Sequence, residues 1–389
     1  MGAARTNADA AGMHDSHKRS LAALERRGRL RSLNRALGLD FSSNDYLGLA
    51  QSRALASAAR AALDRGVPLG AGGSRLLRGN HPEHEALEAE AARFFGAQAA
   101  LFMGGGFAAN TALFATLPER GDLIVHDRLI HASVHDGMAA SRAAVKAAPH
   151  NDAQAIDDII SDWRRGGGTG RAWIAIESLY SMDGDLAPVD ELAKVAQRHD
   201  AMLVIDEAHA TGALGHEGRG LAAQLEGRDD IIALHTCGKA LGVSGALITL
   251  PAALAAYMIN RARPFIYATA PSPLIAATVR AALMHVVTDD GLRQRHSSLV
   301  RHAGQQLAKA CGVVPTGTHI QPIIVHRDDK AVRLARAMQD AGYDIRAVRP
   351  PTVPEGSARL RISLTLNVSE ADVTRMAESL AEAIGEVDQ

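Results

Sequence analysis

The chain has 389 residues, of which 47% are hydrophobic and 22% charged, a balance typical of a globular enzyme long enough for two lobes. With a formal net charge of -1, no overall electric field attracts the chain to nucleic acid or to an anionic membrane, so we expect neither partner. Its two cysteines, Cys237 and Cys311, are too few for a disulfide framework, and residues 1–20 contain no apolar signal segment. A reducing, cytoplasmic location is therefore predicted.

The chain begins with segments that do not resemble a sheet domain. Residues 1 to about 16 are polar and small, which predicts a disordered tail. Residues 17–60 have helical character, broken at residues 40–48, and predict an arm. We therefore expect an N-terminal tail and arm over residues 1–60, a large α/β domain over 61–290 and a small α+β domain over 291–389.

Short apolar segments alternate with helical ones from about residue 99 to residue 250. The helical spacing is clear in Val189–His199. This alternation is typical of a mostly parallel sheet of seven strands, buried on both faces and flanked by helices, with functional residues at the carboxyl ends of the strands. The predicted strands are Ala99–Met103, Leu123–His126, Ala144–Ala147, Ala172–Glu177, Met202–Asp206, Ile231–His235 and Ala246–Leu250.

One stretch of this region, Leu241–Ile259, has no charged residue over 19 positions and is long enough to cross a bilayer. Pro251 interrupts it, however, and Gly, Ser and Thr are scattered through it. A buried strand over Gly245–Leu250, followed by a helix that starts at Pro251, explains it better. After residue 300 the pattern predicts strands at Ile320–His326 and Leu360–Leu366 and helices at Ala331–Ala341 and Glu370–Ile384.

Three reactive side chains follow two neighbouring predicted strands. Asp206 ends one strand and His209 comes three residues later, while Lys239 follows the next strand in a turn of small residues. A lysine, a carboxylate and a histidine at the ends of parallel strands are the set that holds pyridoxal phosphate (PLP). The lysine binds the cofactor covalently, the carboxylate keeps the pyridine nitrogen protonated, and polar groups orient the ring.

A glycine-rich turn, Gly104-Gly-Gly106-Phe107, joins a predicted strand to a predicted helix. Glycines let backbone N–H groups approach an anion at the positive end of a helix, so the turn could be a phosphate cradle. An ordinary tight turn is the alternative. The turn matches neither the Walker A motif nor the dinucleotide-binding fingerprint.

Two other motifs have competing interpretations. Asp206-Glu-Ala-His209 matches the DEAH box of helicases, but the chain contains no Walker A sequence to accompany it. His131 and His135 have the spacing of two zinc ligands on one helix face, but zinc needs a third protein ligand. We expect no metal, and favour one functional or helix-capping role for His131.

A proline-rich segment near the C-terminus, residues 346–354, carries Arg349. Arginine beside a rigid backbone suits bidentate binding of a carboxylate, and a solvent-exposed turn is the alternative.

Taken together, these motifs resemble the α-oxoamine synthases, a branch of the fold-type-I PLP enzymes. The matching segments follow family order from about residue 40 to the C-terminus. They are Phe41-Ser-Ser-Asn-Asp-Tyr-Leu-Gly48, Gly72-Gly-Ser-Arg75, Gly105-Gly-Phe-Ala-Ala-Asn110, Asp127-Arg-Leu-Ile-His131-Ala-Ser133, Glu177-Ser-Leu-Tyr-Ser181-Met-Asp-Gly184, Asp206-Glu-Ala-His209, Thr236-Cys-Gly-Lys239 and Arg349-Pro-Pro-Thr-Val-Pro354.

The resemblance implies a PLP-dependent acyltransferase that condenses an amino acid with an acyl thioester and releases CO₂. Arg349–Pro354 and His150-Asn-Asp are most similar to the family member that joins L-alanine to pimeloyl-CoA or a pimeloyl-carrier protein in biotin synthesis. Another member, such as a glycine C-acetyltransferase, is the alternative. The family also implies a homodimer with shared active sites.

The resemblance also implies roles for individual residues. Lys239, His131, Asp206 and His209 would be catalytic, and His131 would stack on the cofactor ring. The other cofactor-binding residues would be Gly106, Phe107, Ser181, Thr236 and Thr269, the last reaching the neighbouring subunit's phosphate. The substrate-binding residues would be Arg31, Asn44, His131, Arg349 and Thr352, with Arg26, Arg27 and Arg29 as rivals of Arg31.

Overall fold

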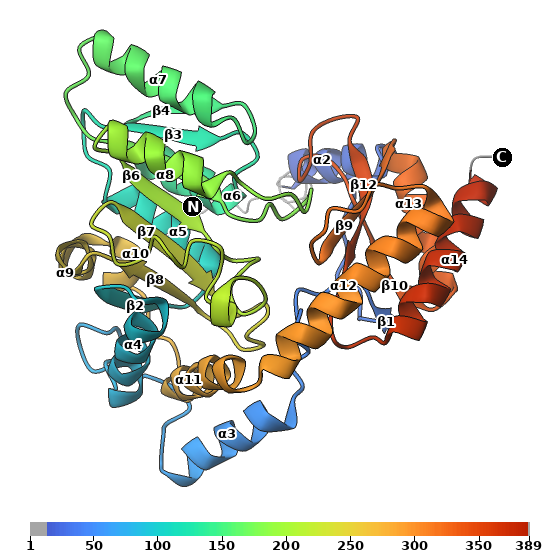
Figure 1. Ribbon diagram of the computed structural model, residues 1–389, viewed down its shortest axis with the longest axis horizontal. Coiled ribbons are helices and arrows are strands. Elements are labelled where there is room, and N and C mark those ends of the chain that lie inside the picture. Colours follow the sequence, from blue (N-terminus) through green and yellow to red (C-terminus); the bar gives the residue numbers. More distant parts are fainter. Residues whose placement is uncertain (1–13, 388–389) are drawn as a thin grey trace, which may run out of the picture. The chain divides into compact units, whose positions relative to one another are not determined.

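The computed structural model describes residues 14–387, which form two compact units (Figure 1). The larger unit comprises residues 43–301 and 365–367, and the smaller one comprises the residues up to Ser42, 302–364 and those from Val368 onward. Most of the tail expected over residues 1 to about 16 lies outside the described residues, and helix α2 (Asp15–Arg26) begins within its last positions. The three-domain division with boundaries at residues 60 and 290 stays a prediction.

The larger unit is built on a seven-stranded sheet in the order β2-β8-β7-β6-β5-β3-β4. Neighbouring strands run parallel except β8, which is antiparallel to both β2 and β7. The predicted sheet is therefore confirmed, with each strand within two residues of its expected bounds. The strands are β2 (Ala99–Met103), β3 (Leu123–Asp127), β4 (Ala144–Ala148), β5 (Ala172–Glu177), β6 (Met202–Asp206), β7 (Ile231–Thr236) and β8 (Ala246–Leu250).

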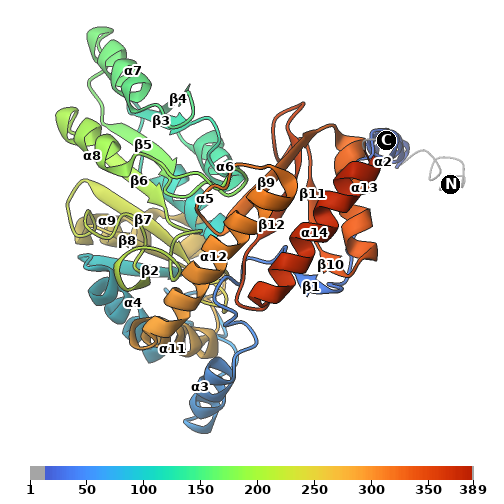
Figure 2. The ribbon, with the colours of Figure 1, turned by 45° about the vertical axis from the view of Figure 1, so that its right-hand side comes forward.

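Helices cover both faces of this sheet, which is why its central strands are apolar throughout rather than alternating (Figure 2). One face packs against α5, α6, α9 and α10, and the other against α7 and α8. Strand β4 is at the edge and largely exposed. The helices of this unit are α3 (Arg53–Asp64), α4 (Pro82–Phe95), α5 (Gly106–Thr116), α6 (Ala132–Ala140), α7 (Ala153–Arg165), α8 (Val189–Arg198), η1 (His216–Gly218), α9 (Ala252–Arg261), α10 (Arg263–Ile266) and α11 (Pro273–Thr288), with α12 (Asp290–Cys311) leading to the smaller unit.

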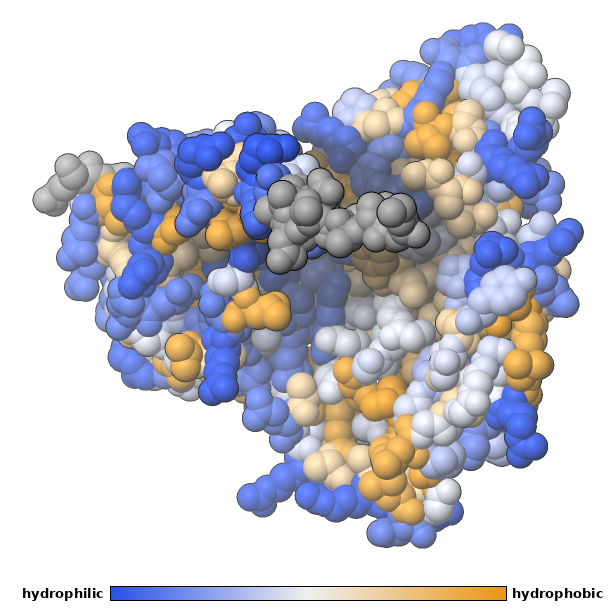
Figure 3. Space-filling view, turned by 180° about the vertical axis from the view of Figure 1, so that it is seen from behind, coloured by the Kyte–Doolittle hydropathy of each residue, from blue (hydrophilic) through white to orange (hydrophobic). Residues whose placement is uncertain are grey.

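The uncharged stretch Leu241–Ile259 forms buried strand β8, then Pro251 as N-cap, then α9, as predicted. Across residues 14–387 no helix combines the length and apolar character needed to span a membrane. The face of the molecule in Figure 3 carries hydrophilic side chains interspersed with small apolar groups.

The smaller unit contains an antiparallel sheet in the order β11-β12-β9 and a short parallel pair, β1 with β10. The strand predicted at Leu360–Leu366 is instead β12, Ala358–Ser363. It ends earlier because Leu366 bonds through its N–H to the carbonyl of Tyr46 instead of continuing the ladder. The remaining elements are β1 (Leu39–Asp40), β9 (Ile320–His326), α13 (Asp328–Asp340), β10 (Tyr343–Asp344), β11 (Arg346–Val348) and α14 (Glu370–Val387).

Candidate active site

A cavity of ≈ 160 Å³ opens in the larger unit where the carboxyl ends of its parallel strands meet. Three catalytic candidates from separate parts of the chain face it: His131, Asp206 and Lys239. The complete lining is Gly106, Phe107, Asn110, His131, Ser133, Glu177, Asp206, Ala208, His209, Leu234, Thr236 and Lys239.

Lys239 is held in a tight turn between β7 and β8. The turn is closed by two backbone bonds, from Gly242 N to Lys239 O at 2.8 Å and from Val243 N to Cys237 O at 2.9 Å. Gly242 has φ +66°, and a Cβ there would lie 2.5 Å from Ala50 N and 2.6 Å from Leu49 C. Only glycine fits this position without displacing the backbone, so the turn is fixed by sequence and by packing together.

The amine of Lys239 belongs to a directed chain of hydrogen bonds. Tyr46 OH donates to Asn44 Oδ1 at 3.0 Å and therefore accepts from Nδ1 of His209, 2.6 Å away. Nε2 of His209 is then the acceptor for Lys239 Nζ at 2.7 Å. Asn44, a predicted substrate ligand, thus connects to the lysine through Tyr46 and His209.

A second chain runs from Asp206 to His131. Asn110 Nδ2 donates to Asp206 Oδ2 at 2.7 Å and to Ser133 Oγ at 3.0 Å. Ser133 Oγ lies 2.8 Å from Nδ1 of His131, which also accepts from Ser133 N at 3.2 Å. Nδ1 is consequently an acceptor, so a neutral His131 carries its proton on Nε2.

His131 is the N-cap of α6, as one of the two interpretations of the His131–His135 pair anticipated. Burial lowers the pKa of His131, and the nearby Lys239 lowers it further, against the opposing effect of Asp206. The ring is therefore neutral near pH 7. The zinc interpretation receives no support, because no cluster of three His, Cys, Asp or Glu side chains suited to a metal occurs within residues 14–387.

Glu177 is a site residue that the sequence analysis did not single out. Its side chain is 3% exposed at the end of β5. Oε2 accepts from Ser181 N at 3.1 Å, while Oε1 has no hydrogen-bond partner among the described residues. Burial, reinforced by the negative charge of Asp206, raises the pKa of Glu177 to about 8. The carboxyl group of Glu177, which lines the cavity, is therefore mostly protonated at pH 7.

The glycine-rich turn opens onto the same cavity at the N-terminus of α5. No side chain caps this end. A Cβ on Gly104 or Gly105 would meet nothing within 4 Å, and one on Gly106 would come no closer than 3.7 Å to its neighbours. Backbone N–H groups at the positive end of the helix are thus open to an anion.

The smaller unit gathers three of the predicted substrate-binding residues. Arg31 Nη2 donates to Thr352 Oγ1 at 3.0 Å, and Thr352 N bonds to Arg349 O at 3.0 Å. Burial lowers the pKa of Arg349, and the neighbouring Arg31 and Arg29 add to this, against the opposing charge of Asp328.

Arg29, one of the rivals of Arg31, is already engaged within the smaller unit. Its Nε lies 2.6 Å from Asp328 Oδ2, and its other two nitrogens bond to Glu355 at 2.8 and 2.6 Å. The choice of Arg31 over Arg26 and Arg27 as the ligand of an anionic substrate stays a prediction.

Comparison with known proteins gives the family. The family model for class I and II aminotransferases matches residues 38–380. An 8-amino-7-oxononanoate synthase from Chromobacterium violaceum is 42% identical over 329 residues, 84% of each chain. A solved 8-amino-7-oxononanoate synthase from Francisella tularensis is 28% identical, with a TM-score of 0.75 over 90% of this chain and 98% of the other.

The chain belongs to the α-oxoamine synthase family of PLP-dependent enzymes. The resemblance found in the sequence is confirmed. The fold agrees as well, since a PLP-bound serine palmitoyltransferase from S. paucimobilis superposes with a TM-score of 0.86 over 96% of this chain and 98% of the other, at 23% identity.

Three independent features of the cavity in this α-oxoamine synthase fit PLP. It places an amine, Lys239, and a carboxylate, Asp206, on one cavity wall formed by adjacent strands. An uncapped helix N-terminus suits a phosphate. Oε1 of Glu177 is a buried polar atom with no hydrogen-bond partner within residues 14–387, as expected where a bound group supplies one.

The other predicted ligands lie away from the cavity lining. Ser181 does not line the cavity, but its backbone N–H donates to Glu177, which does. Thr269 is exposed on the surface of the larger unit, and Arg31, Arg349 and Thr352 belong to the smaller unit. The roles assigned to all these residues stay predictions.

Asn110, Ser133 and Tyr46 form the hydrogen-bond chains of the site but were not predicted as functional. Each lies inside a motif that carried the family resemblance, which was the available signal. Contacts such as Asn110 to Asp206, 96 residues apart, cannot be read from sequence spacing.

Proposed function

We propose that this enzyme condenses L-alanine with pimeloyl-CoA or a pimeloyl-carrier protein, giving 8-amino-7-oxononanoate, CO₂ and the free thiol, as a step of biotin synthesis. The support is a cavity with Lys239, Asp206 and His209 in a chain about 40% identical to 8-amino-7-oxononanoate synthases over most of its length. PLP, when bound, supplies the electron sink that stabilises negative charge at Cα of the amino acid.

Different residues of the site would bind different parts of PLP. The carboxylate of Asp206, fixed by Asn110, would keep the pyridine nitrogen protonated. His209 and Ser181 would bind the ring oxygen, and the N-terminus of α5, with Thr236, would bind the phosphate. His131 would stack on the ring.

Lys239 and His131 would act on the substrates. The amine of Lys239 would remove the Cα proton of alanine, and its bond to His209 keeps Nζ in the cavity. The proton on Nε2 of His131 would be donated to the substrate carboxylate or the thioester oxygen. A bond then forms between alanine Cα and the thioester carbonyl carbon, and the thiolate leaves and takes up a proton. The carboxylate departs as CO₂, and a proton takes its place on Cα.

A steady-state assay with a panel of amino acids crossed with acyl thioesters tests the substrate assignment. We expect the highest kcat/KM with alanine and a pimeloyl thioester. A higher kcat/KM with glycine and acetyl-CoA, or with serine and palmitoyl-CoA, would assign the enzyme to another branch of the family.

We further propose that the enzyme is a cytoplasmic homodimer with shared active sites. Thr269 is exposed, and so are the apolar side chains of Leu77, Phe107 and Tyr267 in the same unit, at 81%, 52% and 72%. Exposed apolar side chains of this size favour an interface between subunits. Sedimentation equilibrium at micromolar concentration should give twice the chain mass, and Thr269→Ala should weaken PLP binding.

A further inference from the structure

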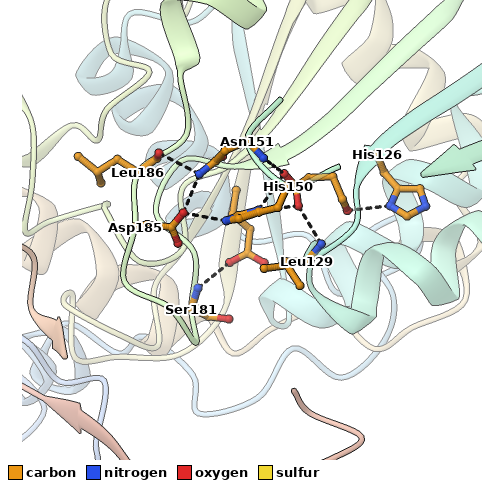
Figure 4. A network of polar contacts seen from close by, with 9 residues as sticks. His126, Leu129, His150, Asn151, Ser181, Asp185 and Leu186 are labelled. Atoms are coloured by element: carbon orange, nitrogen blue, oxygen red, sulfur yellow. Dashed lines mark hydrogen bonds and ion pairs between the residues drawn. The ribbon is translucent and has the colours of Figure 1, made fainter. Parts of the chain in front are cut away.

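His150 contacts two carboxylates at once, outside the cavity (Figure 4). Its Nδ1 lies 2.9 and 3.0 Å from the oxygens of Asp127, and its Nε2 lies 2.7 Å from Oδ2 of Asp185. Ionised carboxylates only accept hydrogen bonds, so both ring nitrogens carry a proton and the ring is an imidazolium. The side chains of His150 and Asp127 are only 17% and 2% exposed, which limits screening by water.

The charges around His150 keep it protonated at neutral pH. Burial by itself would lower the pKa of His150, but the bonds to Asp127 and Asp185 outweigh it and raise that pKa to about 9. The ring of Tyr180 also packs against the imidazole of His150, edge-on and with the ring centroids 4.4 Å apart. Burial raises the pKa of the Tyr180 phenol, so it stays neutral over the same range.

Asp185 belongs to the segment 178–187, which joins β5 to α8. The segment folds back on itself through bonds from Tyr180 N to Asp185 O and from Ala187 N to Ser178 O, each 3.0 Å. Asn151 binds it as well, since Nδ2 donates to Asp185 Oδ2 at 2.6 Å and to Leu186 O at 3.1 Å. Figure 4 shows His150 and Asn151 lying between this segment and the end of β3.

The other end of the same segment reaches the cavity. Ser178 N donates to the carbonyl of Asp206 at 3.0 Å, and Ser181 N donates to Glu177 Oε2 at 3.1 Å. Glu177 lines the cavity. A shift of the segment would therefore move Ser181 and turn the carboxyl group of Glu177.

We propose that His150 is a positioning residue for the cofactor site, acting as an imidazolium clamp on the segment 178–187. By bridging Asp127 and Asp185 it keeps Ser181 and Glu177 where the cavity binds PLP. A neutral imidazole has one N–H and can satisfy only one of the two carboxylates, so deprotonation releases one side of the clamp. The identity of the ligand rests on the proposed function, while the clamp itself does not.

Three variants separate positioning from a merely stabilising ion pair. His150→Gln removes the bridge, because one amide NH₂ cannot reproduce two opposed charged bonds. Asp185→Asn keeps an acceptor for Nε2 but removes one of the two charges that raise the pKa. His199→Gln is the matched control: it breaks a histidine–carboxylate pair with Asp157, His199 is similarly buried at 14% exposure, and neither residue lines the cavity.

The first measurement is the dissociation constant of PLP from each apoenzyme between pH 7 and 10, followed by cofactor absorbance. At pH 7 we expect His150→Gln to bind PLP about tenfold more weakly than the parent, or weaker still. Losses of this size follow when a group that orients a ligand-binding side chain is removed. Asp185→Asn and His199→Gln should stay within about threefold of the parent. In Asp185→Asn the weakening of PLP binding at alkaline pH should begin at lower pH than in the parent.

The second measurement is hydrogen exchange of the peptide covering 178–187, read by mass spectrometry in the apoenzymes. Faster exchange in His150→Gln but not in His199→Gln is expected. Parent-like PLP affinity and exchange in a folded His150→Gln protein would overturn the proposal. If that variant fails to fold, an unchanged alkaline profile in Asp185→Asn would overturn it.

These readouts also keep the two proposals apart. A parent enzyme that binds PLP but does not condense alanine with a pimeloyl thioester refutes the proposed reaction and leaves the clamp standing. Should the parent bind no PLP at all, the exchange rates in the apoenzyme still decide whether His150 holds the segment.

Discussion

Lys239, Asp206 and His209 face one cavity because two neighbouring parallel strands, β6 and β7, end side by side. Asp206 is paired in register with Leu234, so the residues that follow both strands emerge at the same edge of the sheet. Two chains of hydrogen bonds then hold these side chains in position. One connects Lys239 to Asn44, and the other connects Asp206 to His131, whose buried ring is neutral with its proton on Nε2.

Lys239 should carry the cofactor covalently. It supplies the amine of the cavity lining, and the tight turn around it limits where Nζ can reach. Borohydride reduction of the PLP-loaded enzyme followed by peptide mapping should place the label on Lys239. Label on another lysine, together with a Lys239→Ala variant that stays yellow and active, would contradict this assignment.

Asp206→Asn should keep the fold and lose most of the turnover. An amide cannot hold the pyridinium proton, and its NH₂ would face the NH₂ of Asn110 in place of an acceptor. We expect kcat to fall by about a thousandfold or more, in the range seen for loss of a charge-stabilising group. Circular dichroism checks the fold, and a variant within tenfold of the parent would show that Asp206 is not the ring partner.

At the scale of elements, the site depends on the connections that follow strands β2, β5 and β7. The turn between β7 and β8 presents Lys239, the first turn of α5 presents open N–H groups, and the segment after β5 reaches Glu177. A few backbone bonds and glycines at close contacts set the geometry of these connections.

Gly242→Ala should disturb the turn that carries Lys239. The added Cβ would meet the backbone of Leu49 and Ala50 at under 3 Å, and φ is +66°. The matched control is Gly66→Ala, where φ is +82° but nothing lies within 4 Å. We expect the control to cost about 1 kcal/mol of unfolding free energy and Gly242→Ala at least about 2 kcal/mol more, measured by urea denaturation. Equal losses in the two variants would show that the turn adapts.

At the scale of the whole molecule, the chain supplies candidate substrate ligands from two units. The larger unit holds the cavity, and the smaller holds Arg31 and Arg349 beside Thr352. Steady-state kinetics of variants in the smaller unit test whether its arginines contribute to the reaction.

Arg349→Ala should raise the KM for alanine steeply while the PLP absorbance band stays intact. Loss of a charge-assisted pair with the substrate carboxylate in a closed site costs on the order of 2–5 kcal/mol. Arg336→Ala is the control, because its side chain is 81% exposed on α13. An unchanged KM in Arg349→Ala would show that another residue binds the substrate carboxylate, and His131 and Asn44 would be tested next.

The protonation of His150 should appear in the pH dependence of stability. Its pKa is about 9 in the folded protein, against about 6.5 in an unfolded chain. The stabilisation is therefore fully present below about pH 6.5 and is lost as the pH rises through about 9. The difference in unfolding free energy between the parent and His150→Gln should shrink across that window, by on the order of 1–2 kcal/mol after solvent screening. A constant difference from pH 6 to 10 would contradict it.

The sequence by itself determined the seven strands of the sheet, the reactive residues at their ends and the family. Strands buried on both faces must be apolar throughout, and chemistry at the ends of parallel strands leaves a local pattern such as Met202–Asp206 followed by His209. Very short strands leave weak signals, which is why β1, β10 and β11 were not predicted. The end of β12 was misplaced because Leu366 bonds to Tyr46, far away in the sequence, instead of continuing the ladder.

Only the tertiary structure decided which side chains meet. Asn110, the partner of Asp206, comes from a distant segment, and the bridge from His150 to Asp127 and Asp185 joins the end of β3 to two separate connections. The protonation states of Glu177 and His150 follow from these contacts, because burial and neighbouring charges set their pKa values. Local sequence periodicity does not show which distant side chains become neighbours of a given residue.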